Sequence, residues 1–138
     1  MKIGIVGSMQ FVKKILGVEK ELEKLGHKPY LTNLHWNFEG AKSDDEREKI
    51  KLDNKFNKDA IRVFWRAMQG GEAILVLNYN KKGIKNYIGG NTLMEIGFAH
   101  VLGQKIFLLN PIPEIDFYKT EIQAVRPTIL NGDLAKIK

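Results

Sequence analysis

The chain contains no cysteine among its 138 residues. Disulfide bonds, thiolate metal sites and a cysteine nucleophile are therefore excluded. Its three histidines, at positions 27, 35 and 100, are scattered and lack the spacing of metal ligands. We therefore expect neither a metal site nor a cofactor.

Long apolar runs are missing as well. The longest is Ala73–Leu77, far short of the roughly 20 residues that a membrane-spanning helix needs. The amino terminus enters a strand pattern at once, without the layout of a signal peptide. We expect a cytoplasmic protein with no membrane partner.

The formal charge is +6, but the basic residues are spread along most of the chain and alternate with acids, for example in residues 44–49. Mixed charge of this kind is typical of a solvated helix face and argues against nucleic acid as a partner. The positive field equally favours small anionic ligands such as nucleotides. Composition alone does not decide between these partners.

Length and an apolar content of 43% predict one domain that covers residues 1–138. Short apolar runs predict strands at residues 2–7, 28–32, 73–77, 105–109 and 128–130. Helical patterns alternate with them, including an apolar stripe from Phe56 to Met68 in a helix over residues 53–68. Residues 41–51 read as a helix or a mobile lid. The expected fold is a doubly wound, mostly parallel five-stranded α/β sheet, Rossmann-like or flavodoxin-like, with helices on both faces.

Ligands of such sheets bind beyond the carboxyl ends of the strands, and the first candidate there is Gly7-Ser8-Met9. Backbone N–H groups between a buried strand and a helix can hold a phosphate. A glycine turn followed by an ordinary serine N-cap explains the motif equally well. The dinucleotide-binding pattern Gly-x-Gly-x-x-Gly is absent.

The second candidate is the run Gly89-Gly90-Asn91-Thr92, followed by Glu95. The glycines let the backbone approach a ligand, and Thr92 is predicted to begin a helix that ends near Leu102. The spacing Thr92-x-x-Glu95 is also that of a capping box, which by spacing alone is the better explanation. A plain cap does not require the glycine pair.

Asparagines 78, 80 and 91 form a third candidate, around a loop that also carries Lys81 and Lys82. Amides there can hydrogen-bond a base or sugar, and the lysines can meet a phosphate. A solvated loop with turn-forming asparagines is the alternative. Trp36, in a polar loop, is the aromatic residue best suited to stack on a ligand.

Taken together, these motifs resemble the nucleoside 2-deoxyribosyltransferase-like superfamily, which includes transferases and deoxynucleoside monophosphate N-glycosidases. Residues 95–103 resemble the Glu-x-Gly-x-Ala segment of that superfamily, and residues 90–95 are similar to the Thr-x-x-Glu motif of cytokinin-activating phosphoribohydrolases. Members of the superfamily often have an aspartate where this chain has Asn78.

The resemblance implies a hydrolase or transferase that acts on N-glycosidic bonds of nucleosides or their 5′-monophosphates, with Glu95 as the nucleophile. We expect Gly7, Ser8 and the amides near Asn91 and Thr92 to hold a 5′-phosphate, with Asn78 and Trp36 against the base. Met9, Gly89 and Gly90 complete the expected substrate-binding residues. A homodimer or higher homo-oligomer is expected. A non-catalytic nucleotide sensor on the same scaffold is the alternative, and a nucleic-acid binder ranks last.

Overall fold

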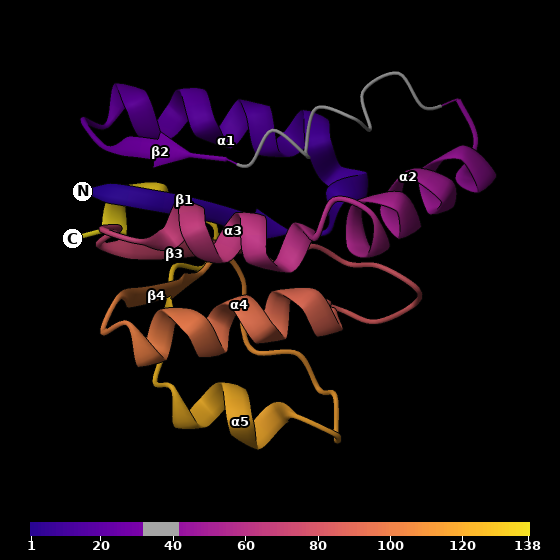
Figure 1. Ribbon diagram of the computed structural model, residues 1–138. Helices are drawn as coiled ribbons and strands as arrows, with labels where there is room; N and C mark the ends of the chain where they lie inside the picture. The colour runs from indigo at the N-terminus through magenta and orange to yellow at the C-terminus, as the bar shows by residue number, and fades with distance from the viewer. Residues whose placement is uncertain (32–41) are drawn as a thin grey trace.

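The computed structural model of the protein describes residues 1–31 and 42–138. Five strands form one sheet in the order β2-β1-β3-β4-β5, and every neighbouring pair is parallel (Figure 1). The strands are β1 (Lys2–Gly7), β2 (Lys28–Tyr30), β3 (Ala73–Leu77), β4 (Lys105–Leu108) and β5 (Thr128–Ile129). The predicted α/β fold is confirmed, in its flavodoxin-like strand order and with all strands parallel.

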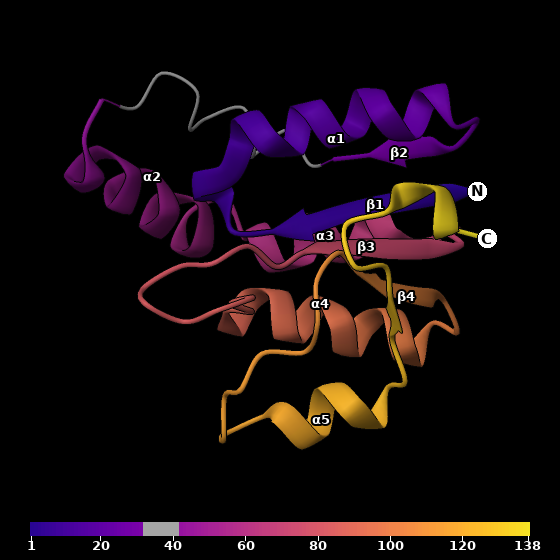
Figure 2. The same ribbon diagram turned by 180° about the vertical axis from the view of Figure 1, so that it is seen from behind.

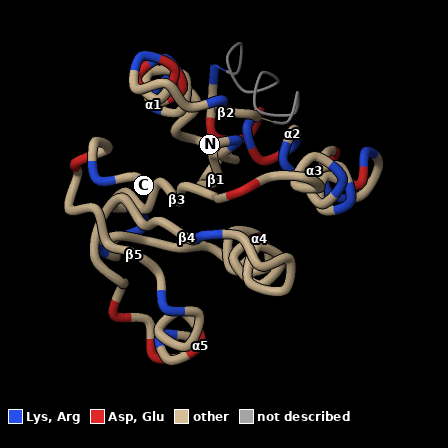
Figure 3. The backbone as a smooth tube through the Cα atoms, turned by 90° about the vertical axis from the view of Figure 1, so that its left-hand side faces the viewer, with Lys and Arg blue, Asp and Glu red and all other residues tan. Residues whose placement is uncertain are grey.

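Helices cover both faces of this sheet. They are η1 (Met9–Phe11), α1 (Val12–Lys24), α2 (Asp44–Phe56), α3 (Ala60–Met68), α4 (Gly90–Val101), α5 (Lys119–Ala124) and η3 (Leu134–Lys136). Ile15 and Leu22 of α1 pack on one face together with Leu134 of η3, which lies in front of β1 in Figure 2. Side chains from α3, α4 and α5 pack on the other face, and the end-on view of Figure 3 separates α1 from α3 and α4.

The central strand β3 explains why its sequence is apolar without interruption. All five of its residues are buried, because α1 packs over one side chain and α4 over the next. A strand covered on both faces has no solvent side, so its pattern does not alternate. Within the described residues, no helix is long and apolar enough to cross a membrane.

The prediction of one helix over residues 53–68 is wrong. The chain forms two helices, because Asp59 adopts a left-handed conformation (φ 49°, ψ 58°) and its carboxylate accepts a hydrogen bond from the Arg62 N–H. Residues 44–51 belong to α2, not to a separate lid. The break also splits the predicted apolar stripe, since Phe56 is 79% exposed whereas Phe64 and Met68 are buried.

Strand order sets the position of the site. From β1 the chain crosses to one side to form β2, and it later returns to form β3 on the other side of β1. Loops that leave β1 and β3 therefore diverge, which opens a crevice at the carboxyl edge of the sheet. The two strands stay paired to their last residues, Gly7 opposite Leu77.

Two glycine substitutions test the packing of this fold. A Cβ atom on Gly71 would lie 3.0 Å from the Met68 carbonyl oxygen and 2.9 Å from the Tyr30 hydroxyl, whereas Gly17 in α1 has nothing within 4 Å. We expect Gly71→Ala to lower the free energy of unfolding by about 1–3 kcal/mol through overpacking. Gly17→Ala should raise it by about 0.5–1 kcal/mol, because alanine favours the helix. Urea denaturation measures both, and equal effects of the two substitutions would contradict the packing described.

Candidate functional site

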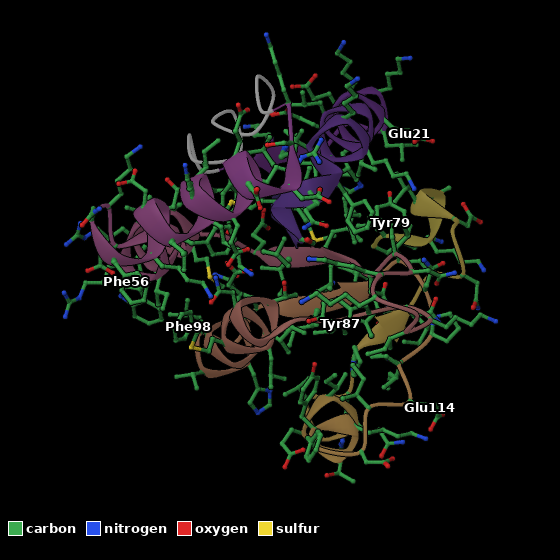
Figure 4. The ribbon with its side chains drawn as sticks, turned by 90° about the vertical axis from the view of Figure 1, so that its right-hand side faces the viewer. Glu21, Phe56, Tyr79, Tyr87, Phe98 and Glu114 are labelled. Atoms are coloured by element: carbon green, nitrogen blue, oxygen red, sulfur yellow. The ribbon has the colours of Figure 1, made fainter. Side chains whose placement is uncertain are left out.

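A cleft of about 430 Å³ opens at the carboxyl edge, beside the divergence of β1 and β3. Figure 4 looks onto this edge and shows Tyr87 next to the amino end of α4. Four segments form the walls: the turn after β1, the helix α2, the loop after β3 and the start of α4. The residues that line the cleft are Gly7, Ser8, Met9, Gln10, Arg47, Glu48, Lys51, Lys55, Lys81, Lys82, Tyr87, Gly89, Gly90, Asn91, Thr92 and Met94.

The turn after β1 is tied across the cleft to the loop after β3. Ser8 Oγ accepts a hydrogen bond of 2.8 Å from Lys81 Nζ. Ser8 occupies the N-cap position, as predicted, but of the short helix η1, and its side chain makes no capping hydrogen bond there. Gly7 allows close packing against β3, because a Cβ atom there would lie 3.1 Å from the Leu77 carbonyl oxygen, closer than an ordinary van der Waals contact.

The loop after β3 is held by its own backbone. Lys81 and Ile84 exchange backbone hydrogen bonds around Lys82 and Gly83, which both have positive φ angles. This pattern matches the tight hairpin turn that favours glycine. Tyr87 donates its backbone N–H to the Tyr79 carbonyl oxygen. The loop therefore presents the Lys81 and Lys82 ammonium groups 5.6 and 5.9 Å from the Tyr87 ring centre, at the mouth of the cleft.

The helix α4 begins at Gly90, two residues earlier than predicted, and Gly89 is its N-cap. Gly89 has no side chain to satisfy the first N–H groups of the helix, and no other described side chain caps them. These N–H groups line the cleft at the positive end of the helix. Among the described residues, the α4 start is thus a set of free donors next to Gly7.

The predicted capping box of Thr92 and Glu95 is wrong. Thr92 is the third residue of α4 and not its N-cap, so Glu95 lies in the second turn. Thr92 is only 6% exposed, and its hydroxyl makes no hydrogen bond with any described residue. Because Thr92 lines the cleft, that hydroxyl is available to a ligand.

Glu95 lines a chamber of about 50 Å³ that adjoins the cleft. The chamber shares Gly7, Met9, Asn91, Thr92 and Met94 with the cleft, and its remaining walls are Ala60, Ile61, Phe64 and Phe98. Burial among these largely apolar side chains raises the pKa of Glu95 to about 8. No described donor reaches its carboxyl group. A carboxyl group of this kind is protonated at neutral pH and is a candidate for acid–base or nucleophilic chemistry.

Positive charge dominates the described lining of the cleft. Five cationic side chains and one carboxylate, that of Glu48, face it. Three of the cations come from α2 and two from the loop after β3. Burial lowers the pKa of Lys81, and the nearby ammonium groups of Lys82 and Lys51 lower it further, whereas Glu48 opposes them. The cleft is therefore suited to an anion.

The structure brings together eight of the ten predicted site residues: seven line the cleft and Glu95 lines the adjoining chamber. Asn78 does not reach the cleft. It is fully buried, donates both amide hydrogens to the carbonyl oxygens of Asn110 and Pro111, and accepts the Asn110 N–H on Oδ1. Its amide is therefore occupied in joining β3 to the segment after β4. Trp36 lies outside the described residues.

Sequence reasoning missed the α2 wall of the cleft. Arg47, Lys51 and Lys55 recur at intervals of four residues, a spacing that puts them on one face of a helix. That spacing was the available signal. Alternating charges in the same segment instead suggested an ordinary solvated helix.

Comparisons of this chain with protein-family models, with curated proteins and with solved structures found no match.

The half-buried Glu95 gives a prediction about stability. Its pKa is raised above the ordinary value of 4.5, so its favourable contribution to folding is complete below about pH 4.5 and is lost as the pH rises to about 8. Glu95→Gln removes this titration. The free energy of unfolding of the variant, minus that of the wild type, should therefore increase between pH 5 and pH 8, on the order of 2 kcal/mol.

Urea denaturation at several pH values measures this difference. Glu121→Gln, at an exposed position of α5, is the matched control and should give a flat difference. A flat difference for Glu95→Gln as well would show that Glu95 titrates normally.

Proposed function

We propose that this protein cleaves the N-glycosidic bond of a nucleoside or a nucleoside 5′-phosphate, with Glu95 as the group that attacks or stabilises the sugar. One observation carries the proposal: the only carboxyl group in the described lining of the chamber adjoins a basic cleft at a helix start. The phosphate and the sugar of one ligand can therefore meet an anion site and a carboxyl group at the same time.

Cleavage of an N-glycosidic bond in a nucleotide needs both a carboxyl group and an anion site. As the bond between sugar and base breaks, positive charge develops on the anomeric carbon, and a carboxylate can attack that carbon or stabilise it. The free N–H groups at the α4 start and the Thr92 hydroxyl can hold a phosphate at the other end of the sugar. Thr92 and Asn91 line both cavities, so one helix positions both functions.

The resemblance to the nucleoside 2-deoxyribosyltransferase-like superfamily supports this proposal through residues 90–103. The flavodoxin-like sheet is compatible with it, but a fold of this kind hosts many activities. Asn78 is left out of the proposed base contacts, since its amide is engaged with Asn110 and Pro111.

A base-release assay tests the activity. The protein is incubated with a panel of nucleosides and nucleoside 5′-monophosphates, and the products are chromatographed for free base. We expect release by the wild type, and a fall of at least about a hundredfold in Glu95→Gln. Glu121→Gln should release base at the wild-type rate. Adding a second free base distinguishes a transferase, which exchanges bases, from a hydrolase.

The second candidate function is a nucleotide sensor without catalysis, favoured by the protonated state of Glu95 at neutral pH. Thermal stabilisation by nucleotides without base release from any substrate would support the sensor function and rule out the proposed enzymatic activity.

The pH dependence gives a further prediction for the nucleophile. Only the ionised carboxylate can attack carbon, and burial holds the pKa of Glu95 at about 8. We expect kcat/KM to rise about tenfold per pH unit below pH 8 and to level off above it. A kcat/KM that instead falls above pH 8 would mean that protonated Glu95 acts as an acid toward the leaving base, and would rule out the nucleophilic role.

A further inference from the structure

The cleft holds more positive charge than one phosphate group requires. Five cations and one carboxylate line its described walls, which leaves four positive charges in excess. A phosphate monoester carries about 1.5 to 2 negative charges near neutral pH. Asp44, outside the cleft, pairs with Arg47 and offsets one of these charges. About one positive charge would still remain unbalanced if the ligand carried a single phosphate.

The α2 wall supplies three of these cations from one helical face. Arg47, Lys51 and Lys55 all line the cleft, whereas Lys49 on the same helix is exposed and does not line it. Arg47 is paired with the exposed Asp44, and Lys51 lies 3.8 Å from Glu48. Lys55 makes no ion pair with a described residue. The wall is therefore only partly neutralised by the protein itself.

The wall formed by the loop after β3 is likewise only partly neutralised. Lys82 has no carboxylate partner among the described residues, and Lys81 is bonded only to the neutral Ser8 hydroxyl. The ammonium groups of Lys51 and Lys82 both act to lower the pKa of Lys81. Cations from the two walls are thus close enough to repel one another, and an anion between them would relieve that repulsion.

A second set of donors lines the same cleft, at the α4 start. These donors are uncharged: the free N–H groups of the first turn, and the hydroxyl of the buried residue Thr92, which has no hydrogen-bond partner among the described residues. This part of the cleft borders the chamber of Glu95, which the lysine side chains do not line. Asn91 and Thr92 of the α4 start line both the cleft and the chamber, so this set of donors is the one that adjoins Glu95.

We propose that the cleft binds a ligand with two linked phosphates, of the nucleoside 5′-diphosphate type. The phosphate next to the sugar lies at the α4 start, and the outer phosphate lies between Lys51, Lys55 and Lys82. The proposal rests on the proposed function for the place of the sugar beside Glu95. The number of phosphates rests on the charge of the two walls.

Calorimetric titration of the full chain tests this proposal at physiological ionic strength. The Glu95→Gln variant is used so that no turnover accompanies binding. Adenosine, guanosine, cytidine and uridine 5′-monophosphates are each compared with the corresponding diphosphate, and inorganic phosphate with pyrophosphate. We expect the diphosphate to bind at least about tenfold more tightly within the pairs that bind, because the outer phosphate gains a charge attraction of about 1.4 kcal/mol or more.

Substitutions on α2 locate the outer phosphate. Lys51→Ala and Lys55→Ala should each remove most of the diphosphate advantage, because they weaken diphosphate binding much more than monophosphate binding. Lys49→Ala, the matched loss of charge on the same helix, should leave both affinities unchanged. An equal effect of all three substitutions would mean that a general field attracts the ligand, and would overturn the assignment.

Several other results of these titrations would overturn the diphosphate proposal or separate it from the proposed function. Equal affinity within the pairs, tighter monophosphate binding, or no binding in any pair would overturn the proposal. Tighter binding of a 5′-phosphorylated oligonucleotide than of any diphosphate would overturn it in favour of nucleic acid. A diphosphate preference without base release by the wild type from any nucleoside, 5′-monophosphate or 5′-diphosphate would refute only the proposed function. Base release with equal affinities would refute only this inference.

Discussion

The contact between Gly7 and the end of β3 is the constraint on which the site depends. β1 and β3 stay paired to their last residues, and a Cβ atom at Gly7 would lie only 3.1 Å from the Leu77 carbonyl oxygen. The segments that follow β1 and β3 therefore leave the sheet side by side, and the strand order makes them diverge. The turn at Ser8 and the start of α4 then lie beside the same crevice. The free N–H groups and the Glu95 chamber are consequences of that arrangement.

The strands could be predicted from the sequence, because a parallel sheet covered on both faces requires apolar strands. The unbroken apolar run of β3 is an example. The end of α1 could also be predicted, because Gly26 adopts a positive φ angle there. The break between α2 and α3 could not be predicted in this way. It depends on Asp59 in a left-handed conformation, and neither glycine nor proline marks it.

The site shows why spacing alone is ambiguous. Ser43-x-x-Glu46 and Thr92-x-x-Glu95 have the same form, yet only the first caps a helix: Ser43 Oγ accepts the Glu46 N–H, and Glu46 accepts the Lys42 N–H. Thr92 and Glu95 both lie inside α4, because Gly89 occupies the N-cap position. Phe64 of α3 then helps to enclose Glu95. This contact joins residues far apart in the chain, so local pattern does not reveal it.

The hydrogen bonds between Asn78 and Asn110 have a consequence for the thermodynamics of association. They join the ends of two neighbouring strands, and the Ser8–Lys81 bond and the Lys82–Gly83 turn hold the adjoining loop. This wall is therefore preorganised, and a ligand does not have to order its backbone. For the proposed anionic ligand, the entropic cost would fall instead on the long side chains that contact it, at about 0.5–1.5 kcal/mol for each one immobilised. At this wall, affinity would accordingly be limited by the ordering of lysine side chains and not by folding of the loop.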